Sequence, residues 1–157
     1  MKSFTSIDGI DATELSTSIV LTAKEDGLKP ISVAVVDAHG HPLEAYRMEG
    51  ASADSFFIAI AKAETAVRGG RDTVEIAYKV ENDDWKPMPA HEHRADDNRR
   101  VVNPGFISWA GGCVIRVDGT VAGAVAVSGR DELDDHELAS VARKNWRVAR
   151  RDDPDAY

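Results

Sequence analysis

The chain has 157 residues, 43% hydrophobic and 29% charged, an ordinary balance for one globular domain with a sizeable core. Its 27 acidic and 19 basic residues give a net charge of −8, which excludes the basic footprint of a nucleic-acid-binding protein. It has no apolar run of membrane-spanning length, no signal-peptide core and one cysteine, so we expect a cytoplasmic protein without disulfides or membrane partners.

The N-terminal part predicts a helix followed by a central strand. Residues 11–26 carry apolar side chains at four-residue steps, with Thr13 or Asp11 as the cap and Gly27 as the stop. Residues 31–36, "ISVAVV", show no polar alternation, which indicates a strand covered on both faces.

A second strand and the strongest helix follow. Residues 43–49 alternate as an antiparallel partner does, after a turn at 37–42. Residues 52–68 predict a helix that is capped near Ser52 and ended by two glycines. Its apolar stripe consists of Phe56, Ile60, Ala63 and Val67.

The middle of the chain is dominated by a long charged loop. A weaker helix is expected at 73–82, and residues 83–105 then hold three prolines and many charges. A loop of that length in a compact domain is often functional, so we expect it to cover a binding site.

A hairpin bracketed by glycines comes next. Asp118-Gly119 predicts a two-residue turn between strands 113–117 and 120–127. One face of the second strand would carry Val121, Val125 and Val127 with Gly123. The other would carry Ala122, Ala124 and Ala126, a surface for a helix, another subunit or a flat ligand.

The last helix is expected at 132–150, with acids at its start and arginines at its end, before a frayed tail at 151–157. Paired strands with grouped helices indicate an α+β fold with an antiparallel sheet. We expect one domain over residues 1–157, with its core at about 10–150.

Several motifs resemble the GlcG/HbpS-like family of haem-binding or haem-degrading domains, which also form the C-terminal part of some corrinoid adenosyltransferases. They occur in the family's order and cover nearly all of residues 10–148. The matching residues are the strand ending in Asp37, Gly40-His41, Arg47–Gly50, Lys62-Ala63, Thr65-Ala66, Pro104–Phe106, Gly111-Gly112, Val117–Gly119 and Val127–Gly129. The resemblance implies a profilin-like antiparallel sheet of about five strands flanked by helices, a homo-oligomer and a haem-like ligand.

The glycines that bracket the hairpin are one candidate site. Gly111, Gly112, Ser128 and Gly129 would meet at one sheet edge, because a hairpin brings its two ends together. They could line a notch of exposed backbone N–H groups for an anion or a planar ligand, or they could simply allow close packing.

Three residues in the first half of the chain, Asp37, Arg47 and Lys62, could face the same ligand. Lys62 could pair with a carboxylate or propionate, or be a solvated helix lysine. Arg47 could bind the ligand or pair with Asp37 or Glu49.

The loop offers further candidates. His91 and His93 could act as general acid and base, as a haem ligand or as metal ligands, or be solvated. Arg99 and Arg100 could bind a carboxylated substrate, as an enzyme would require, or belong to a solvated run of charges.

No metal site has diagnostic spacing, and Cys113 has no basic neighbour in sequence, so it is interpreted as a buried small hydrophobe. The sequence therefore favours a small-ligand-binding protein over an enzyme of a small-molecule pathway, and both over a purely structural subunit.

Overall fold

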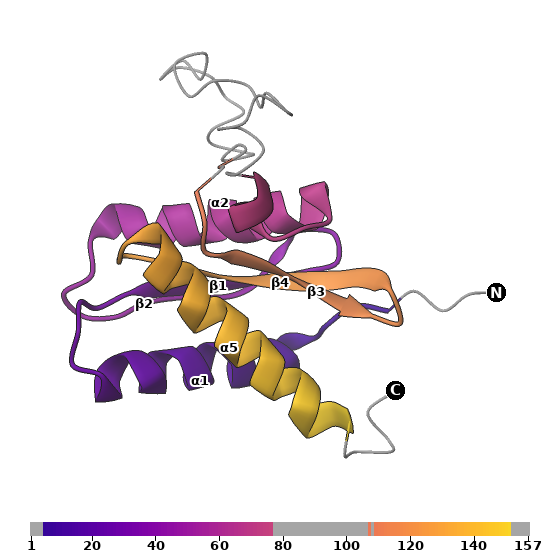
Figure 1. The fold of residues 1–157 in the computed structure, drawn as a ribbon, viewed down its shortest axis with the longest axis horizontal. Coiled ribbons are helices and arrows are strands. Elements are labelled where there is room, and N and C mark those ends of the chain that lie inside the picture. Colours follow the sequence, from indigo (N-terminus) through magenta and orange to yellow (C-terminus); the bar gives the residue numbers. More distant parts are fainter. Residues whose placement is uncertain (1–4, 77–106, 108, 152–157) are drawn as a thin grey trace, which may run out of the picture.

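The computed structural model describes residues 5–76, 107 and 109–151, with side chains up to residue 147. Four strands form one antiparallel sheet in the order β2-β1-β4-β3. They are β1 (Ser32–Asp37), β2 (Pro42–Arg47), β3 (Gly112–Val117) and β4 (Thr120–Ser128). Helix α2 (Ala53–Gly69) covers one face, and α1 (Gly9–Glu25) and α5 (Glu132–Arg151) cover the other (Figure 1). This confirms the α+β class, with four of about five expected strands in the described residues.

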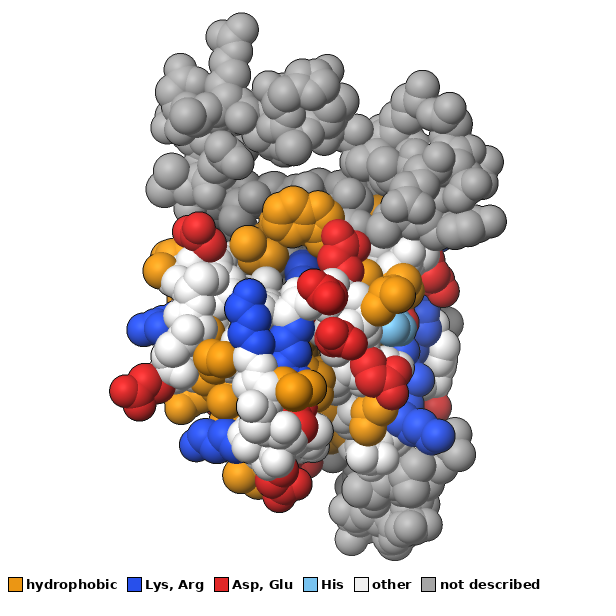
Figure 2. All heavy atoms as spheres, turned by 60° about the vertical axis from the view of Figure 1, so that its left-hand side comes forward, with side chains coloured by type: hydrophobic (Ala, Val, Ile, Leu, Met, Phe, Trp, Pro, Cys, Tyr) orange, Lys and Arg blue, Asp and Glu red, His pale blue; other side chains and the backbone are white. Residues whose placement is uncertain are grey.

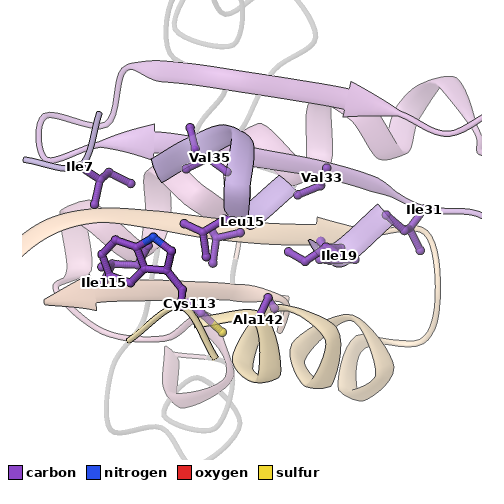
Figure 3. Close-up of a cluster of buried hydrophobic side chains, with 14 of the residues drawn as sticks. Ile7, Leu15, Ile19, Ile31, Val33, Val35, Cys113, Ile115 and Ala142 are labelled. Atoms are coloured by element: carbon purple, nitrogen blue, oxygen red, sulfur yellow. The ribbon is translucent and has the colours of Figure 1, made fainter. Parts of the chain in front are cut away.

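Strand β1 is central, as its unbroken apolar run predicts. It pairs with β2 on one side and β4 on the other, and its apolar side chains are almost fully buried. Val33 and Val35 join the larger core with Leu15 and Ile19 of α1 (Figure 3). Ala34 and its neighbours on the opposite face pack in a second cluster beneath α2. The two clusters explain why the run lacks polar alternation.

Helix α1 begins earlier than the sequence pattern predicts. Asp8 is the N-cap, and its Oδ1 accepts hydrogen bonds from the backbone N–H groups of Ile10 and Asp11 at 2.9 and 3.0 Å. Asp11 completes a capping box by accepting the Asp8 N–H at 2.9 Å. The predicted caps, Thr13 and Asp11, were therefore wrong, because Asp11 is the reciprocal member of the box.

Helix α2 has the predicted ends and a buried face that is wider than the predicted stripe. Ser52 caps its start, and Gly70 ends it in the left-handed conformation at φ 64°. The buried face overlaps the predicted apolar stripe, since Ala63 is buried and Ile60 and Val67 are partly buried against the same cluster. It also includes polar residues, and the buried residues of α2 are Ser55, Ala59, Ala61, Lys62, Ala63, Glu64, Thr65 and Ala66. The next helix is seen at residues 73–76, and the rest of its predicted range is outside the described chain.

A β-bulge divides the expected alanine face of β4. The β3–β4 register shifts between Ile115 and Arg116, so Ala122 joins the core beneath α1 and α5. Ala124 and Ala126 stay on the opposite face and pack beneath α2. The predicted single face was therefore wrong at Ala122. The neighbour of Ala124 and Ala126 is therefore a helix of the same chain. This contradicts the alternative in which these alanines form an interface with another subunit.

None of the helices in the described parts of the chain is long and apolar enough to cross a membrane.

Candidate functional site

A buried ion pair connects the helices on opposite faces of the sheet. The Lys62 ammonium of α2 lies 3.2 Å from Oδ2 of Asp135, in the first turns of α5, and each side chain is 2% exposed. The same ammonium donates a hydrogen bond to the Val127 carbonyl of β4 at 3.0 Å. This burial excludes the solvated-lysine interpretation of Lys62. The lysine is a fixed element of the fold.

Burial acts on both charges of the pair. It lowers the pKa of Lys62 and raises the pKa of Asp135, because a charge loses hydration when it leaves water. Each shift is opposed by attraction to the other member of the pair. The Arg130 backbone N–H adds a hydrogen bond to Oδ1 of Asp135 at 3.0 Å. Asp135 is therefore held from two sides.

Lys62 also explains the double glycine before β3. A Cβ atom on Gly111, whose φ is +129°, would lie 2.5 Å from the Val127 carbonyl oxygen and 2.9 Å from the Lys62 ammonium. A Cβ atom on Gly112 would lie 2.5 Å from the Lys62 carbonyl oxygen. The Gly112 N–H already donates to Thr73 Oγ1 at 2.9 Å. The groups that approach these two glycines are thus the Val127 carbonyl of β4 and Lys62 of α2, so the double glycine allows close packing.

A cleft of about 390 Å³ opens above this pair. Its floor consists of four buried lining residues, which are Lys62, Asp135, Ser55 and Ser128. The Ser55 hydroxyl lies 2.7 Å from that of Ser32 on β1. Of the predicted ligand-binding residues, the cleft brings together Lys62, Ser128 and Gly129.

The rim of the cleft carries one aromatic ring and mixed charges. Trp109 is 51% exposed, and Lys29 is also exposed. The Arg130 guanidinium is bound to both oxygens of Asp26 at 2.6 and 2.8 Å, so it braces the loop after α1. The acids at the start of α5 complete the rim. Figure 2 shows this end of the molecule, where basic and acidic side chains lie next to each other.

The structure places Asp37 and Arg47 away from the cleft lining. Asp37 Oδ1 accepts the backbone N–H groups of His39 and His41 at 2.8 and 3.0 Å, and so shapes the β1–β2 turn. Arg47 donates to the Ala51 carbonyl at 2.8 Å. Both contacts are local to turns. They do not test whether Asp37 or Arg47 binds a ligand, so that role stays a prediction.

Four predicted residues cannot be compared with the structure. His91, His93, Arg99 and Arg100 lie outside the described residues. Their roles as acid, base, haem ligand or substrate anchor stay predictions.

Cys113 is fully buried in β3, as expected, but it has basic groups nearby in space. Its Sγ lies 3.7 Å from Nδ1 of His136, and the Arg143 guanidinium is close enough to oppose the effect of burial on its pKa. Burial is the larger effect and raises the pKa of Cys113 to about 12. The sequence shows no basic neighbour of this thiol, and α5 brings one from 23 residues away.

Sequence reasoning missed Asp135 and Ser55 as site residues. Asp135 was interpreted only as one of the acids that favour a helix start. No local spacing connects it with Lys62, 73 residues earlier. The available signal was a lysine within the buried stripe of α2, since a buried ammonium requires an acid nearby.

Three comparisons with known proteins agree with this architecture. The family model "Haem degrading protein HbpS-like" matches residues 7–144. Protein GlcG of Escherichia coli K12 is 29% identical over 120 residues, which cover 73% of this chain and 78% of GlcG. A double mutant of HbpS from Streptomyces reticuli superposes with a TM-score of 0.74 at 27% identity, covering 92% of this chain and 90% of HbpS.

The fold is shared with a further solved structure, a complex of PduOC with haem. It is 24% identical, with a TM-score of 0.70, and covers 88% of this chain and 94% of PduOC. At that identity the likeness concerns the fold alone. Because the family model matches most of its length, the chain belongs to the HbpS-like family.

Proposed function

We propose that this protein binds a small, flat, carboxylated molecule in the cleft above Lys62 and Asp135, and that this molecule is haem. The observation that carries the proposal is the cleft itself, which has a buried charged floor and an aromatic ring on its rim. Its volume of about 390 Å³ lies in the range of small-molecule sites. The family description and the haem complex of PduOC support haem as the ligand.

The cleft residues suit the two chemical parts of such a ligand. Trp109, half exposed on the rim, offers an aromatic face for a flat ring. Lys29, exposed beside it, offers a cation for a carboxylate. Ser52 and Ser128 add hydroxyl groups that can donate hydrogen bonds. Because Lys62 is already paired with Asp135, it would orient the ligand more than it would neutralise its charge.

The described cleft residues fit the ring and the carboxylates of haem better than its iron. Axial ligands of haem iron are usually His, Cys, Met or Tyr, and none of these occurs among the described residues that line the cleft. The proposal therefore derives affinity from the porphyrin ring and its carboxylates. It makes a specific prediction, that metal-free protoporphyrin IX binds about as tightly as haemin.

The test is a titration of the purified protein with haemin and, separately, with protoporphyrin IX. We expect saturation near one equivalent for both compounds. Trp109→Ala and Lys29→Ala should each weaken binding by about tenfold, as expected for the loss of about 1.4 kcal/mol. Lys144→Ala, which removes an exposed lysine from α5, is the matched control and should leave the affinity unchanged.

Three results would contradict the proposal or part of it. Binding that does not saturate would indicate adsorption to the surface. Binding that saturates but is insensitive to both rim substitutions would place the ligand outside this cleft. A haemin affinity far above that of protoporphyrin IX would show that an iron ligand is present, and His91→Ala and His93→Ala would then identify it.

A further inference from the structure

Three side chains of metal-ligating types, none of which lines the cleft, converge near the start of β3. Asp72 precedes the short helix at 73–76, Cys113 lies on β3, and His136 lies on α5. One ligand atom from each lies within 4.8 Å of the other two. Some point is therefore no more than about 2.8 Å from all three atoms, within a few tenths of an ångström of metal–ligand bond lengths.

The thiol and the imidazole already have the separation that a tetrahedral site needs. Cys113 Sγ and His136 Nδ1 are 3.7 Å apart. Zinc bonds of about 2.3 Å to sulfur and about 2.0 Å to nitrogen, at a tetrahedral angle, place these atoms about 3.5 Å apart. A cation could thus be inserted between them with little movement of β3 or α5.

Asp72 supplies the third ligand while keeping a structural role. Its carboxylate accepts two hydrogen bonds from the Arg143 guanidinium, at 2.6 and 2.9 Å, and one from the Val114 backbone N–H at 2.9 Å. Both the Val114 bond and the shorter Arg143 bond go to Oδ1, whereas Oδ2 accepts one bond. A carboxylate offers about four lone-pair sites, so capacity for a cation remains.

We propose that Cys113, His136 and Asp72 form a binding site for a borderline-soft divalent cation of the zinc class. Thiolate and imidazole ligands select such metals over magnesium or calcium. Binding replaces the thiol proton of Cys113 by a metal–sulfur bond and releases that proton to solvent. Asp72 and His136 are partly exposed, which gives the cation a route to the buried sulfur. The three protein ligands leave a fourth position for water.

Arg143 limits the affinity of the site for a cation. Its positive charge lies against one of the ligands, so it opposes a second cation and competes for the Asp72 carboxylate. We expect a moderate affinity in the native chain. Arg143→Gln should tighten cation binding several-fold, because it removes the charge and frees the carboxylate.

The test is a titration of the chelator-treated protein with Co²⁺, whose absorption reports a cobalt–thiolate bond in the near ultraviolet and tetrahedral geometry in the visible. We expect one equivalent to produce both bands, and Zn²⁺ to abolish them by displacement. Cys113→Ser and His136→Ala should remove the thiolate band or weaken Co²⁺ binding by more than tenfold. His41→Ala, which removes an exposed histidine outside the cluster, should change nothing.

The outcome is decided by these spectra, with circular dichroism to show that each variant is folded. Absence of a thiolate band in the native protein, or a band unaffected by His136→Ala, overturns the site. An Asp72→Asn variant that binds Co²⁺ as tightly as the native protein also overturns it, since the carboxylate is then no ligand. The experiment contains no porphyrin, so its result is independent of the proposed function of the cleft.

Discussion

Lys62 on α2 and Asp135 on α5 form an ion pair of 3.2 Å with both side chains withdrawn from water. The two helices flank opposite faces of the sheet, so the pair closes the end of the molecule where β4 stops and β3 begins. A pair of this kind contributes little net stability, because desolvation offsets the attraction, but removal of one member leaves an uncompensated buried charge.

The first prediction concerns the loss of one member of this pair. Lys62→Met should lower the free energy of unfolding by about 3–5 kcal/mol, since Asp135 is left buried and unpaired. The double variant Lys62→Met/Asp135→Leu should be more stable than Lys62→Met alone. Urea unfolding measures both, and Lys144→Met, at an exposed position on α5, should change the stability by less than about 0.5 kcal/mol. If the changes in the free energy of unfolding caused by Lys62→Met alone and Asp135→Leu alone add up to that of the double variant, the two side chains are not coupled.

The second prediction concerns the glycine against which Lys62 packs. Gly111→Ala should destabilise the protein by roughly 3 kcal/mol, because the new Cβ would meet backbone at 2.5 Å in a conformation that L residues rarely adopt. Gly9→Ala is the control, since nothing lies within 4 Å of its added Cβ. That substitution should alter the free energy of unfolding by no more than about 0.5 kcal/mol. Equal effects of the two alanines would mean that Gly111 is not confined between the Val127 carbonyl of β4 and the Lys62 ammonium.

A third prediction distinguishes the core beneath α2 from a subunit interface. Ala124 is fully buried between β4 and α2, so Ala124→Leu should cost about 1–3 kcal/mol of stability by overpacking. Val141→Leu, at an exposed position on α5, should be nearly neutral. Urea unfolding and size-exclusion chromatography should be measured together. A stable Ala124→Leu protein that has merely changed its oligomeric state would restore the interface interpretation.

The sequence predicted those parts of the fold whose causes are local. The apolar run at 31–36 identified the central strand, because a strand between two cores needs no polar residue on either face. Ser52 and Gly70 marked the ends of α2 because capping depends on a few neighbouring residues.

The parts that sequence could not predict depend on two distant segments at once. The bulge at Ala122 follows from the joint register of β3 and β4, which neither strand encodes alone. The floor of the cleft requires residues 62 and 135 to meet, and the thiol cluster requires residues 72, 113 and 136 to meet. Their residue types were visible in the sequence, but their proximity is a product of the sheet order.

The last prediction concerns a buried carboxylate that forms no ion pair with the described residues. Glu64 on α2 is 8% exposed, and its Oε2 has no hydrogen-bond partner among the described residues. Burial raises the pKa of Glu64 above its ordinary value of 4.5, against the attraction of Arg68 and His41. At pH values between 4.5 and the raised pKa of Glu64, the folded state therefore binds more protons than the unfolded state. The contribution of Glu64 to the free energy of unfolding falls as the pH rises through that range.

Glu64→Gln removes the titration while keeping the shape of the side chain. The variant should be more stable than the native protein by about 1 kcal/mol at pH 7, because burial disfavours the charged form of the native carboxylate. The difference should become small at pH 4, below the ordinary pKa of 4.5, where most of the carboxyl groups are protonated in both states. Urea unfolding across this pH range measures it, with Glu137→Gln on the exposed side of α5 as the control. A stability difference that does not change with pH would show that Glu64 is as well solvated in the folded chain as in the unfolded one.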